Sequence, residues 1–532
     1  MKKISLLSII LLFVFASCNQ SQSPDKKDKK ISKRDYSITK ENAFNDLFLD
    51  SSQVENYITK NSLPDSVARR IRSFYNTRNY EFAWFSSDGL SEHAMGFSSL
   101  VNFTGDTSAR QKKLQKIMDN LLAEDDLKVS VKNAIIINTE LMLTEKLIDY
   151  TRSNFDKGYV KRKEMERFIP FKKSDPLELA DSLLNKKHND DKYFADINKP
   201  YKLLSEQLKK YTEIAKAGGW PSIEGSVTSF KEGASHPEII SIKKLLSITG
   251  DLPGQDSSSL FDDNLKKGIM SFQRRFGQTA SGKITDATLR EMKVPVTSRI
   301  KQILINMNRM RWLPSEPENK LIVVNIPAFL LHVYDERKQV FSMPVVVGKE
   351  GHNTTLFSDK LTTIVFSPYW NVPPSIVKKE IIPGMEKDEN YLADHQMEIT
   401  GNDGGIPVVR QLPGPKNSLG KVKFLFPNIF NIYFHDTPAK SFFDKDVRAY
   451  SHGCIRLSDP LKLATYLLEG NDSWTSQNIE KAMDSSTEQQ VVLKNPVPVF
   501  ITYYTSWVDE NGQLNFRDDI YDHDLIVGKK MF

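Results

Sequence analysis

The chain has 532 residues, of which 26% are charged and 39% hydrophobic, and its formal net charge is +6. A compact domain usually has roughly 100–200 residues, so this length predicts about three domains and at least one large core. A mild basic excess over such a length does not argue for nucleic-acid binding, which would call for a concentrated basic face. The two cysteines, Cys18 and Cys454, exclude a disulfide framework and a zinc site built mainly from cysteine.

The first 17 residues have the layout of a secretory signal. Two lysines precede the apolar run at 4–15, which is too short to cross a bilayer as a helix of about 20 residues. Ala16-Ser17-Cys18 follows, and small residues directly before a cysteine resemble a bacterial lipobox. The resemblance implies lipid attachment at Cys18, so we expect an exported lipoprotein, anchored in a membrane and facing the periplasm. An ordinary signal peptide with an incidental cysteine is the alternative.

A helical half is followed by a β-rich half. In residues 45–233 apolar side chains recur three to four positions apart, which predicts helices, and the isolated His93 and His188 are expected at the surface. From residue 320 short β-branched runs predict a β-sandwich or barrel-like domain. We therefore predict an α+β multidomain protein whose helical parts precede a mainly β domain.

The predicted segments, in chain order, are a signal peptide (1–17), a flexible tether (18–44), a helical scaffold (45–233), a small helical module (234–295), a linker helix (296–319), the mainly β domain (320–508) and a C-terminal extension (509–532). An irregular insertion rich in proline and glycine, at about 373–422, interrupts the β domain. Insertions of this kind are usually lids or binding loops, so we expect a lid subdomain.

The small module carries Phe-Gln-Arg-Arg-Phe-Gly at 272–277 and Ser-Gly-Lys-Ile-Thr at 281–285. These strings resemble a peptidoglycan-binding type 1 module. Ser281 and Lys283 depart from the usual pattern, which has Asp-Gly and a second glycine before the threonine. A packing module without glycan contact is the alternative.

The stretch that carries chemistry contains a histidine and a cysteine 19 positions apart. His435 ends an apparent strand, and Cys454 lies in Ser451-His452-Gly453-Cys454. A free thiol with a pKa of about 8.5 is mostly protonated at neutral pH, and a neighbouring imidazole can take the proton and hold the ion pair. Both His435 and His452 are candidates for this base. Gly453 permits a sharp turn, and the amides of Gly453 and Cys454 are natural oxyanion donors.

A metal site is an alternative for the same residues. His435, Asp436, His452 and Cys454 are all side chains that can bind zinc. No pair of them has a standard zinc-ligand spacing, however, and a cysteine in a glycine-containing turn suits nucleophilic work better.

The pattern resembles the catalytic motif of the L,D-transpeptidase family. That motif is a histidine, a gap, Ser/Thr-His-Gly-Cys, a hydrophobic residue and an asparagine; here residues 436–450 fill the gap and Ile455 is the hydrophobic residue. Arg456 stands in place of the asparagine. This variant is similar to the large multidomain members that have a helical scaffold and a peptidoglycan-binding module.

The resemblance implies that Cys454 is the nucleophile and His435 the base. It implies that the backbone carbonyl of Asp436 orients the imidazole, and that Gly453 and Cys454 supply the oxyanion amides. The expected substrate-binding residues are Arg456, Tyr433, His452, Ser451, Trp370 and Asn371. A structural salt bridge is the alternative for Arg456, and a place in the core is the alternative for Trp370.

The implied function is cysteine-dependent acyl transfer in cell wall biogenesis. Cys454 attacks the third residue of a donor tetrapeptide stem of peptidoglycan, expels D-alanine and forms a thioester. The side-chain amine of a diamino acid in an acceptor stem resolves it into a 3→3 cross-link, while the lid excludes water. We expect no cofactor, no metal and no nucleic acid. A cysteine L,D-carboxypeptidase that trims stems, and a non-catalytic wall-binding lipoprotein, are the alternatives.

Overall fold

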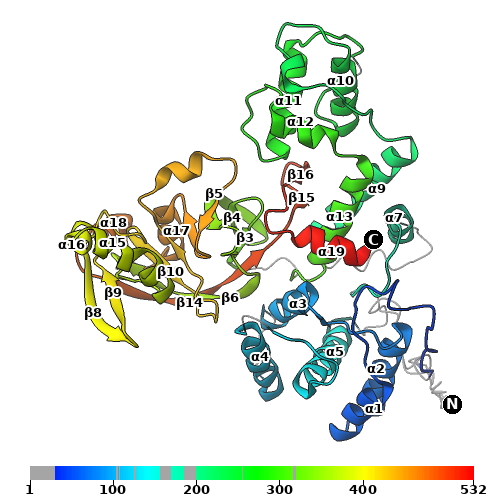
Figure 1. The fold of residues 1–532 in the computed structure, drawn as a ribbon, viewed down its shortest axis with the longest axis horizontal. Coiled ribbons are helices and arrows are strands. Elements are labelled where there is room, and N and C mark those ends of the chain that lie inside the picture. The colour runs from blue at the N-terminus through cyan, green and yellow to red at the C-terminus, as the bar shows by residue number, and fades with distance from the viewer. Residues whose placement is uncertain are drawn as a thin grey trace, which may run out of the picture.

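The computed structural model describes residues 30–103, 106, 108–124, 127–155, 169–184, 199–254, 256–314 and 319–532. The predicted signal peptide, Cys18, most of the tether and His188 lie outside these ranges. Within them, no helix has the length and apolar character needed to cross a membrane. Figure 1 shows a helical lobe, a small helical module and a β-rich lobe that meet around a central group of helices. The predicted α+β multidomain fold is confirmed.

The scaffold lobe is helical apart from two short paired strands. Its elements are α1 (Ser51–Lys60), α2 (Asp65–Thr77), β1 (Phe85–Ser86), β2 (Gly89–Leu90), α3 (Glu92–Phe103), α4 (Ala109–Leu122), α5 (Ala134–Phe155), α7 (Pro176–Leu184) and α9 (Lys199–Lys216). Asp50 starts α1 with a capping box, and Ser108 caps α4. The core is strongly aromatic, and it includes Trp84 and also Trp312, which comes from far along the chain.

His93 on α3 is buried, so the expectation of a surface histidine is wrong. Asn308 and the indole of Trp312 each approach one of its ring nitrogens at 3.4 Å. These partners lie more than 200 residues away in sequence, which is why the polar residues beside His93 in the sequence gave no sign of burial.

The small module packs around its own core and leads into a long helix. Its elements are η2 (Val227–Ser229), α10 (Glu238–Thr249), α11 (Asp263–Arg275) and α12 (Asp286–Lys293), and α13 (Val296–Met310) follows. Asp262 caps α11, and Gly277, with φ +66°, lies just beyond the helix end, as the sequence pattern predicts.

The β-rich lobe is a sheet that closes on itself. Its strands are β3 (Leu321–Asn325), β4 (Leu330–Asp335), β5 (Lys338–Gly348), β6 (Phe357–Phe366), β10 (Val422–Leu425), β11 (Phe434–His435), β12 (Ala449–Ser451), β13 (Ile455–Leu457) and β14 (Gln489–Thr502). Closure follows because β5 pairs with both β4 and β13. Apolar side chains fill the interior, and α17 (Pro460–Leu467) and α18 (Ser476–Met483) pack against it.

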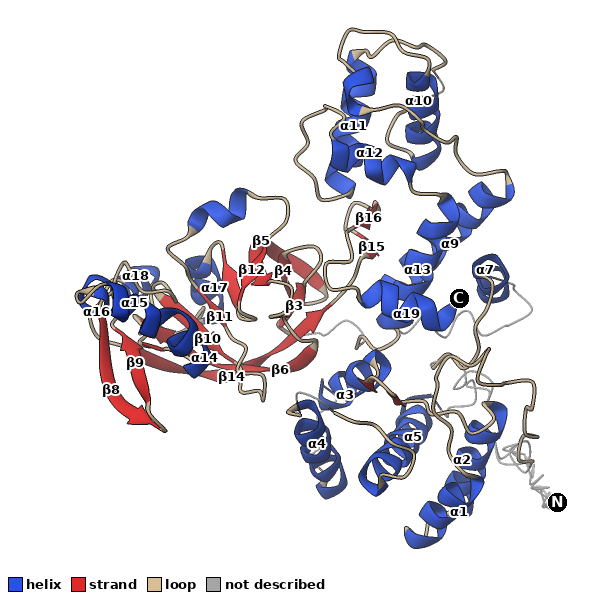
Figure 2. Ribbon diagram, viewed as in Figure 1, coloured by secondary structure: helices blue, strands red, loops and turns tan. Residues whose placement is uncertain are grey.

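The predicted insertion is a separate small subdomain. It contains β7 (Trp370–Asn371), α14 (Pro374–Ile376), a π-helical turn η3 (Val377–Ile381), α15 (Ile382–Lys387), α16 (Tyr391–Asp394), β8 (Met397–Asp403) and β9 (Ile406–Gln411). A further short helix, η4 (Lys440–Asp444), lies outside the insertion, between β11 and β12. Its strands form a sheet of their own over a small apolar core. Figure 2 shows its hairpin projecting from the end of the lobe.

The C-terminal segment joins the lobes. Its elements are β15 (Ser506–Val508), β16 (Leu514–Phe516) and α19 (His523–Met531). They share a core with α9 and α13, and Figure 1 shows the red helix α19 at this junction. Arg309 on α13 is buried there between Glu92 of the scaffold, at 2.9 Å, and Asp524 of α19. Burial alone would raise the pKa of Glu92, but Arg309 and His523 lower it to about 2, so Glu92 stays ionised.

Arg309→Met tests whether this junction is a main source of stability. The substitution removes the shared cation from two partly buried carboxylates, of which Glu92 keeps His523 as a partner, and we expect it to reduce the free energy of unfolding by about 3 kcal/mol in a chemical denaturation experiment. Arg290→Met is the matched control, because the side chain of Arg290 is 60% exposed and its ion pairs lie at the surface. Equal losses for the two variants would contradict the assignment.

Candidate active site

Two neighbouring parallel strands bring the predicted catalytic residues together. In the β11–β13 register, Phe434 lies opposite Ile455 and His435 opposite Arg456. The amide of Ile455 donates to the carbonyl of Tyr433 at 3.1 Å, which extends the register by one residue. Cross-strand neighbours share a face and successive residues alternate between faces. Tyr433, His435, Cys454 and Arg456 therefore project from one face, and the alternate residues are buried in the core.

His435 is buried and has one ring nitrogen fixed by the backbone. Its Nδ1 lies 2.5 Å from the carbonyl oxygen of Asp436, and a carbonyl can only accept, so Nδ1 carries the proton. Nε2 is thereby left as the basic nitrogen. Burial, followed by the positive charge of Arg456, lowers the pKa of His435 to about 3.

Asp436 is itself held from three directions. Its amide donates to Val422, its carboxylate accepts from the amide of Lys421 at 2.9 Å, and Lys440 pairs with the same carboxylate at 2.6 Å. The carbonyl that orients the imidazole is therefore fixed by the strand and by the segment where the insertion returns to the sheet.

Cys454 is partly exposed, and its thiol donates to the carbonyl of Asn431 at 3.6 Å. Burial raises the pKa of the thiol, while hydrogen bonds from Tyr433 and the charge of Arg456 act in the opposite direction. The low pKa of His435 and the raised pKa of Cys454 both favour the neutral forms over the ion pair expected from the sequence. Neutral forms suit general-base catalysis, in which proton transfer accompanies nucleophilic attack.

Three side-chain contacts shape the turn before Cys454. Gly453 has φ +111°, where a larger residue would be strained. Ser451 Oγ accepts from the Gly453 amide at 3.2 Å and donates to the Cys454 carbonyl at 2.6 Å. Thr354 Oγ1 donates to the Gly453 carbonyl at 2.8 Å. The Gly453 amide is thus occupied, whereas the Cys454 amide has no partner in the described part of the chain and can donate to a ligand.

Arg456 is half-buried and forms no ion pair with any residue that the structure describes, so the salt-bridge alternative lacks an acidic partner. Its Nε is buried without a hydrogen-bond partner, and its guanidinium lies 5.8 Å from the ring centre of Phe442. A cation beside the nucleophile with free donors is suited to binding a carboxylate.

The remaining predicted residues contact the insertion. His452 Nε2 lies 3.7 Å from Glu380 on the π-helical turn, and its ring lies 4.9 Å from that of His352. Trp370 and Asn371 form β7 in the sheet of the insertion, where Trp370 packs against the small core and Asn371 is exposed. The structure therefore places these two residues on the insertion rather than on the Cys454 face.

Sequence reasoning missed Thr354, Glu380 and Gly420. Gly420 has φ +62°, and a Cβ there would lie 2.4 Å from the Asp436 carboxylate. Only the glycine itself could have given a signal, because the other two are ordinary residues brought in by folding. In the part of the chain described, no three potential metal ligands lie close enough to hold an ion.

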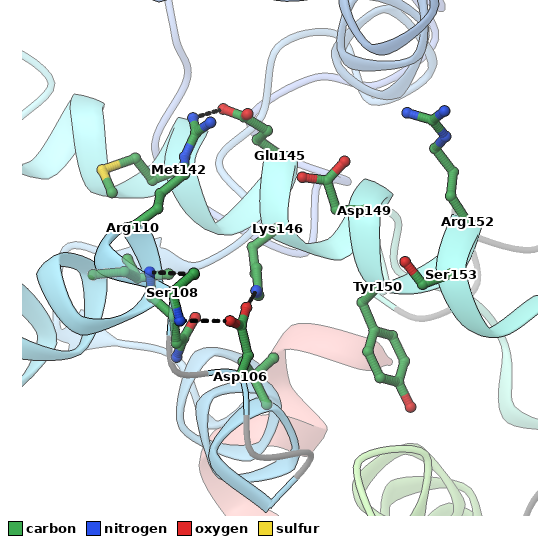
Figure 3. Close-up of a pocket in the computed structure, with 13 residues that line it drawn as sticks. Asp106, Ser108, Arg110, Met142, Glu145, Lys146, Asp149, Tyr150, Arg152 and Ser153 are labelled. Carbon is green, nitrogen blue, oxygen red and sulfur yellow. Dashed lines mark hydrogen bonds and ion pairs between the residues drawn. The ribbon is translucent and has the colours of Figure 1, made fainter.

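A cavity of about 690 Å³ lies in the scaffold beside α4 and α5 (Figure 3). Four of its charged side chains form two ion pairs, Arg110 with Glu145 and Lys146 with Asp106. None of the described residues that line it is a cysteine or a histidine. It therefore does not offer the thiol and imidazole that the Cys454 face presents.

Gly420→Ala tests the support of Asp436. The new methyl group must displace the Asp436 carboxylate and with it the orienting carbonyl, so we expect acylation of Cys454 by a carbapenem, followed by intact mass, to slow by about tenfold or more. Gly470→Ala is the matched control, with φ +76° and open space around the site of the Cβ. It should keep the acylation rate, and a normal rate in Gly420→Ala would refute the positioning role.

The pH dependence of alkylation tests the neutral pair. Iodoacetamide reacts with the thiolate, so the rate at Cys454, followed by peptide mass spectrometry, should rise with a midpoint above the value of about 8.5 for a free cysteine. Because the pKa of His435 lies at about 3, no step should appear near pH 6.5. Tyr433→Phe removes a stabilising donor and should move the midpoint higher. A fast plateau between pH 5 and 7 would instead indicate an ion pair.

Comparison with known proteins identifies the domains. Residues 319–491 match the family model for the L,D-transpeptidase catalytic domain, 69–208 the scaffold domain, and 235–292 the "Putative peptidoglycan binding domain". A Haemophilus influenzae protein described as "Putative L,D-transpeptidase" is 31% identical over 240 residues, which cover 42% of this chain. The chain spans about half (48%) of the length of that relative.

Solved structures give weaker likenesses. An L,D-transpeptidase from Mycobacterium smegmatis is 16% identical over 35% of this chain and 58% of its own, with a TM-score of 0.19. One from Stackebrandtia nassauensis is 15% identical over 53% of this chain and 96% of its own, with a TM-score of 0.22. The family matches confirm the resemblance drawn from the motif: the chain carries an L,D-transpeptidase catalytic domain, together with a scaffold domain and a peptidoglycan-binding-type domain.

Proposed function

We propose that this protein forms 3→3 cross-links in peptidoglycan by acyl transfer through a thioester on Cys454. The observation that carries the proposal is the shared face of β11 and β13, where a thiol, an imidazole protonated on Nδ1, a tyrosine and an arginine without an acidic partner among the described residues lie together. These are the groups that an acyl transfer requires: a nucleophile, a base, a donor to the nucleophile and a substrate anchor.

The first half-reaction follows from the neutral resting pair. Cys454 Sγ attacks the carbonyl of the third stem residue while its proton moves to Nε2 of His435, and the Cys454 amide receives the developing oxyanion. The carbonyl of Asp436 stabilises the imidazolium that forms. The imidazolium then gives its proton to the leaving amine of D-alanine as the C–N bond breaks, which leaves a thioester and a neutral His435.

The second half-reaction reverses these proton movements. The side-chain amine of a diamino acid in an acceptor stem attacks the thioester carbonyl and gives a proton to His435. The C–S bond breaks, and His435 returns the proton to the sulfur. Arg456 is placed to bind a carboxylate of the stem peptide, in keeping with its lack of an acidic partner among the described residues.

Two features suit transfer to an amine rather than to water. The insertion contacts the motif through Glu380 and His452, so it is placed to cover the thioester as a lid. A groove of about 580 Å³ lies between the scaffold and the catalytic domain, and its wall includes Phe430, next to the Asn431 that contacts Cys454. Asp119 and Asp359 in its walls suit a cationic amine, so the groove is our candidate site for the acceptor stem.

We also propose that the protein is an exported lipoprotein attached to a membrane through Cys18. The support is the sequence of the first 18 residues, in which a basic start and an apolar run lead to Ala16-Ser17-Cys18. Several acyl chains on one cysteine would give stable anchoring.

Purified protein incubated with disaccharide-tetrapeptides tests the reaction. We expect cross-linked dimers and released D-alanine by mass spectrometry, and neither product from Cys454→Ala. His435→Gln should lose both products as well, whereas His452→Gln, which contacts the lid, should keep measurable acylation. Tripeptides without dimers would instead identify an L,D-carboxypeptidase, and activity in Cys454→Ala would refute the nucleophile.

A further inference from the structure

A ladder of stacked groups runs outward from the active-site face. The guanidinium of Arg456 lies 5.8 Å from the ring centre of Phe442, and Phe442 stacks on Tyr450 with ring centres 4.8 Å apart and 20° between their planes. Phe442 is half-buried, whereas Tyr450 is 41% exposed at the outer end. We call Phe442 and Tyr450 the aromatic step. An ordered aromatic pair that is open to solvent at its outer end presents a flat ring surface to a ligand.

The aromatic step lies on the segment that connects the nucleophile with the small module. Tyr450 is on β12, and the loop before it contains Asp446. The carboxylate of Asp446 accepts from both the amide and the hydroxyl of Thr279, at 3.0 and 2.7 Å. Thr279 belongs to the peptidoglycan-binding-type domain. Figure 1 shows this orange segment rising from the catalytic lobe toward the module.

The module cannot turn freely about this contact. Arg275 is buried in it, binds Asp251 of the module at 2.8 Å and donates to the carbonyl of Leu514 at 2.8 Å. Arg517 in turn donates to the Arg275 carbonyl at 2.7 Å. A glycan strand bound to the module would therefore run in a fixed direction relative to Cys454.

The length of the ladder matches the distance between the attacked carbonyl and the sugar in a sugar-bearing stem. The attacked carbonyl is that of the third stem residue, so three residues lie between it and the sugar, a span of roughly 10 Å in an extended chain. The two spacings of the ladder, 5.8 and 4.8 Å, laid end to end from Arg456 to Tyr450, are of that scale. A pyranose ring presents a face of C–H groups, which suits the negative face of an aromatic ring.

We propose that Phe442 and Tyr450 form a sugar-binding subsite, which holds the glycan ring that carries the donor stem while Arg456 holds the peptide. The inference rests on the proposed function for the identity of the donor. Its occupant is a glycan rather than a protein partner, because the segment is continuous with a domain of the peptidoglycan-binding type.

Calorimetric binding to the full chain carrying Cys454→Ala, which cannot turn over, tests the subsite. The ligands are the free tetrapeptide and the disaccharide-tetrapeptide. We expect the sugar to increase affinity by about three- to tenfold, and Tyr450→Ala to remove that increase while free-tetrapeptide affinity stays the same within about twofold. Tyr450→Phe, which keeps the ring, should retain the increase.

Val447→Ala is the control, because Val447 is 49% exposed on the same loop and contributes no ring; it should behave like the parent. Equal affinity of the parent for the two ligands, no binding of either ligand, or a parallel loss of both in Tyr450→Ala would each overturn the proposal. The assay needs no catalysis, so sugar-dependent binding by a protein that makes no dimers would contradict the proposed reaction and leave the subsite standing.

Discussion

The parallel pairing of β11 with β13 is the constraint on which the site depends. The two strands have only two and three residues, and their register places His435 and Arg456 opposite each other. Because alternation then assigns the faces, the pairing also places Tyr433 beside Cys454, and it directs Phe434, Ile455 and Leu457 into the core. The buried apolar residues fix the position of each strand, and the reactive side chains lie between them on the opposite face. The burial that stabilises the sheet therefore also orients the reactive groups.

The charges around this face act differently on the thiol and the imidazole of the proposed catalytic pair. Arg456 disfavours a proton on His435 and favours the thiolate of Cys454, while burial disfavours both charged forms. The Asp436 carbonyl can stabilise an imidazolium only after a proton arrives on Nε2. In the proposed reaction, charge separation is therefore deferred to the moment of attack, when the oxyanion is also present and the donors around it act in a partly dehydrated site. A thiol kept neutral at rest is also protected from adventitious oxidation, since the thiolate is the reactive form.

The parts of the site that the sequence predicts are those set by local chain geometry. A histidine at the end of a β-rich run, and a glycine before a cysteine, specify a strand end and a sharp turn whatever surrounds them. The supports could not be predicted, because they join distant segments. Thr354 and Gly453 are 99 positions apart, and Gly420 fits against Asp436 only when the insertion returns to the sheet. The burial of His93 could not be predicted either, because its partners come from α13 and the turn after it.

In the proposed reaction, the donor stem and the acceptor stem approach the sulfur from different sides. The module and the scaffold lie on opposite sides of the central helices in Figure 1, and each has its own contact with the catalytic lobe. The module reaches the Asp446 loop, and the scaffold forms the groove beside Phe430. The ion pairs of the buried Arg309 hold the scaffold against the central helices. The hydrogen bond from Arg275 to the carbonyl of Leu514 holds the module against the C-terminal hairpin. A cross-link needs a donor and an acceptor that do not compete for one entrance, and a rigid junction that separates their routes meets that need without any motion of whole domains.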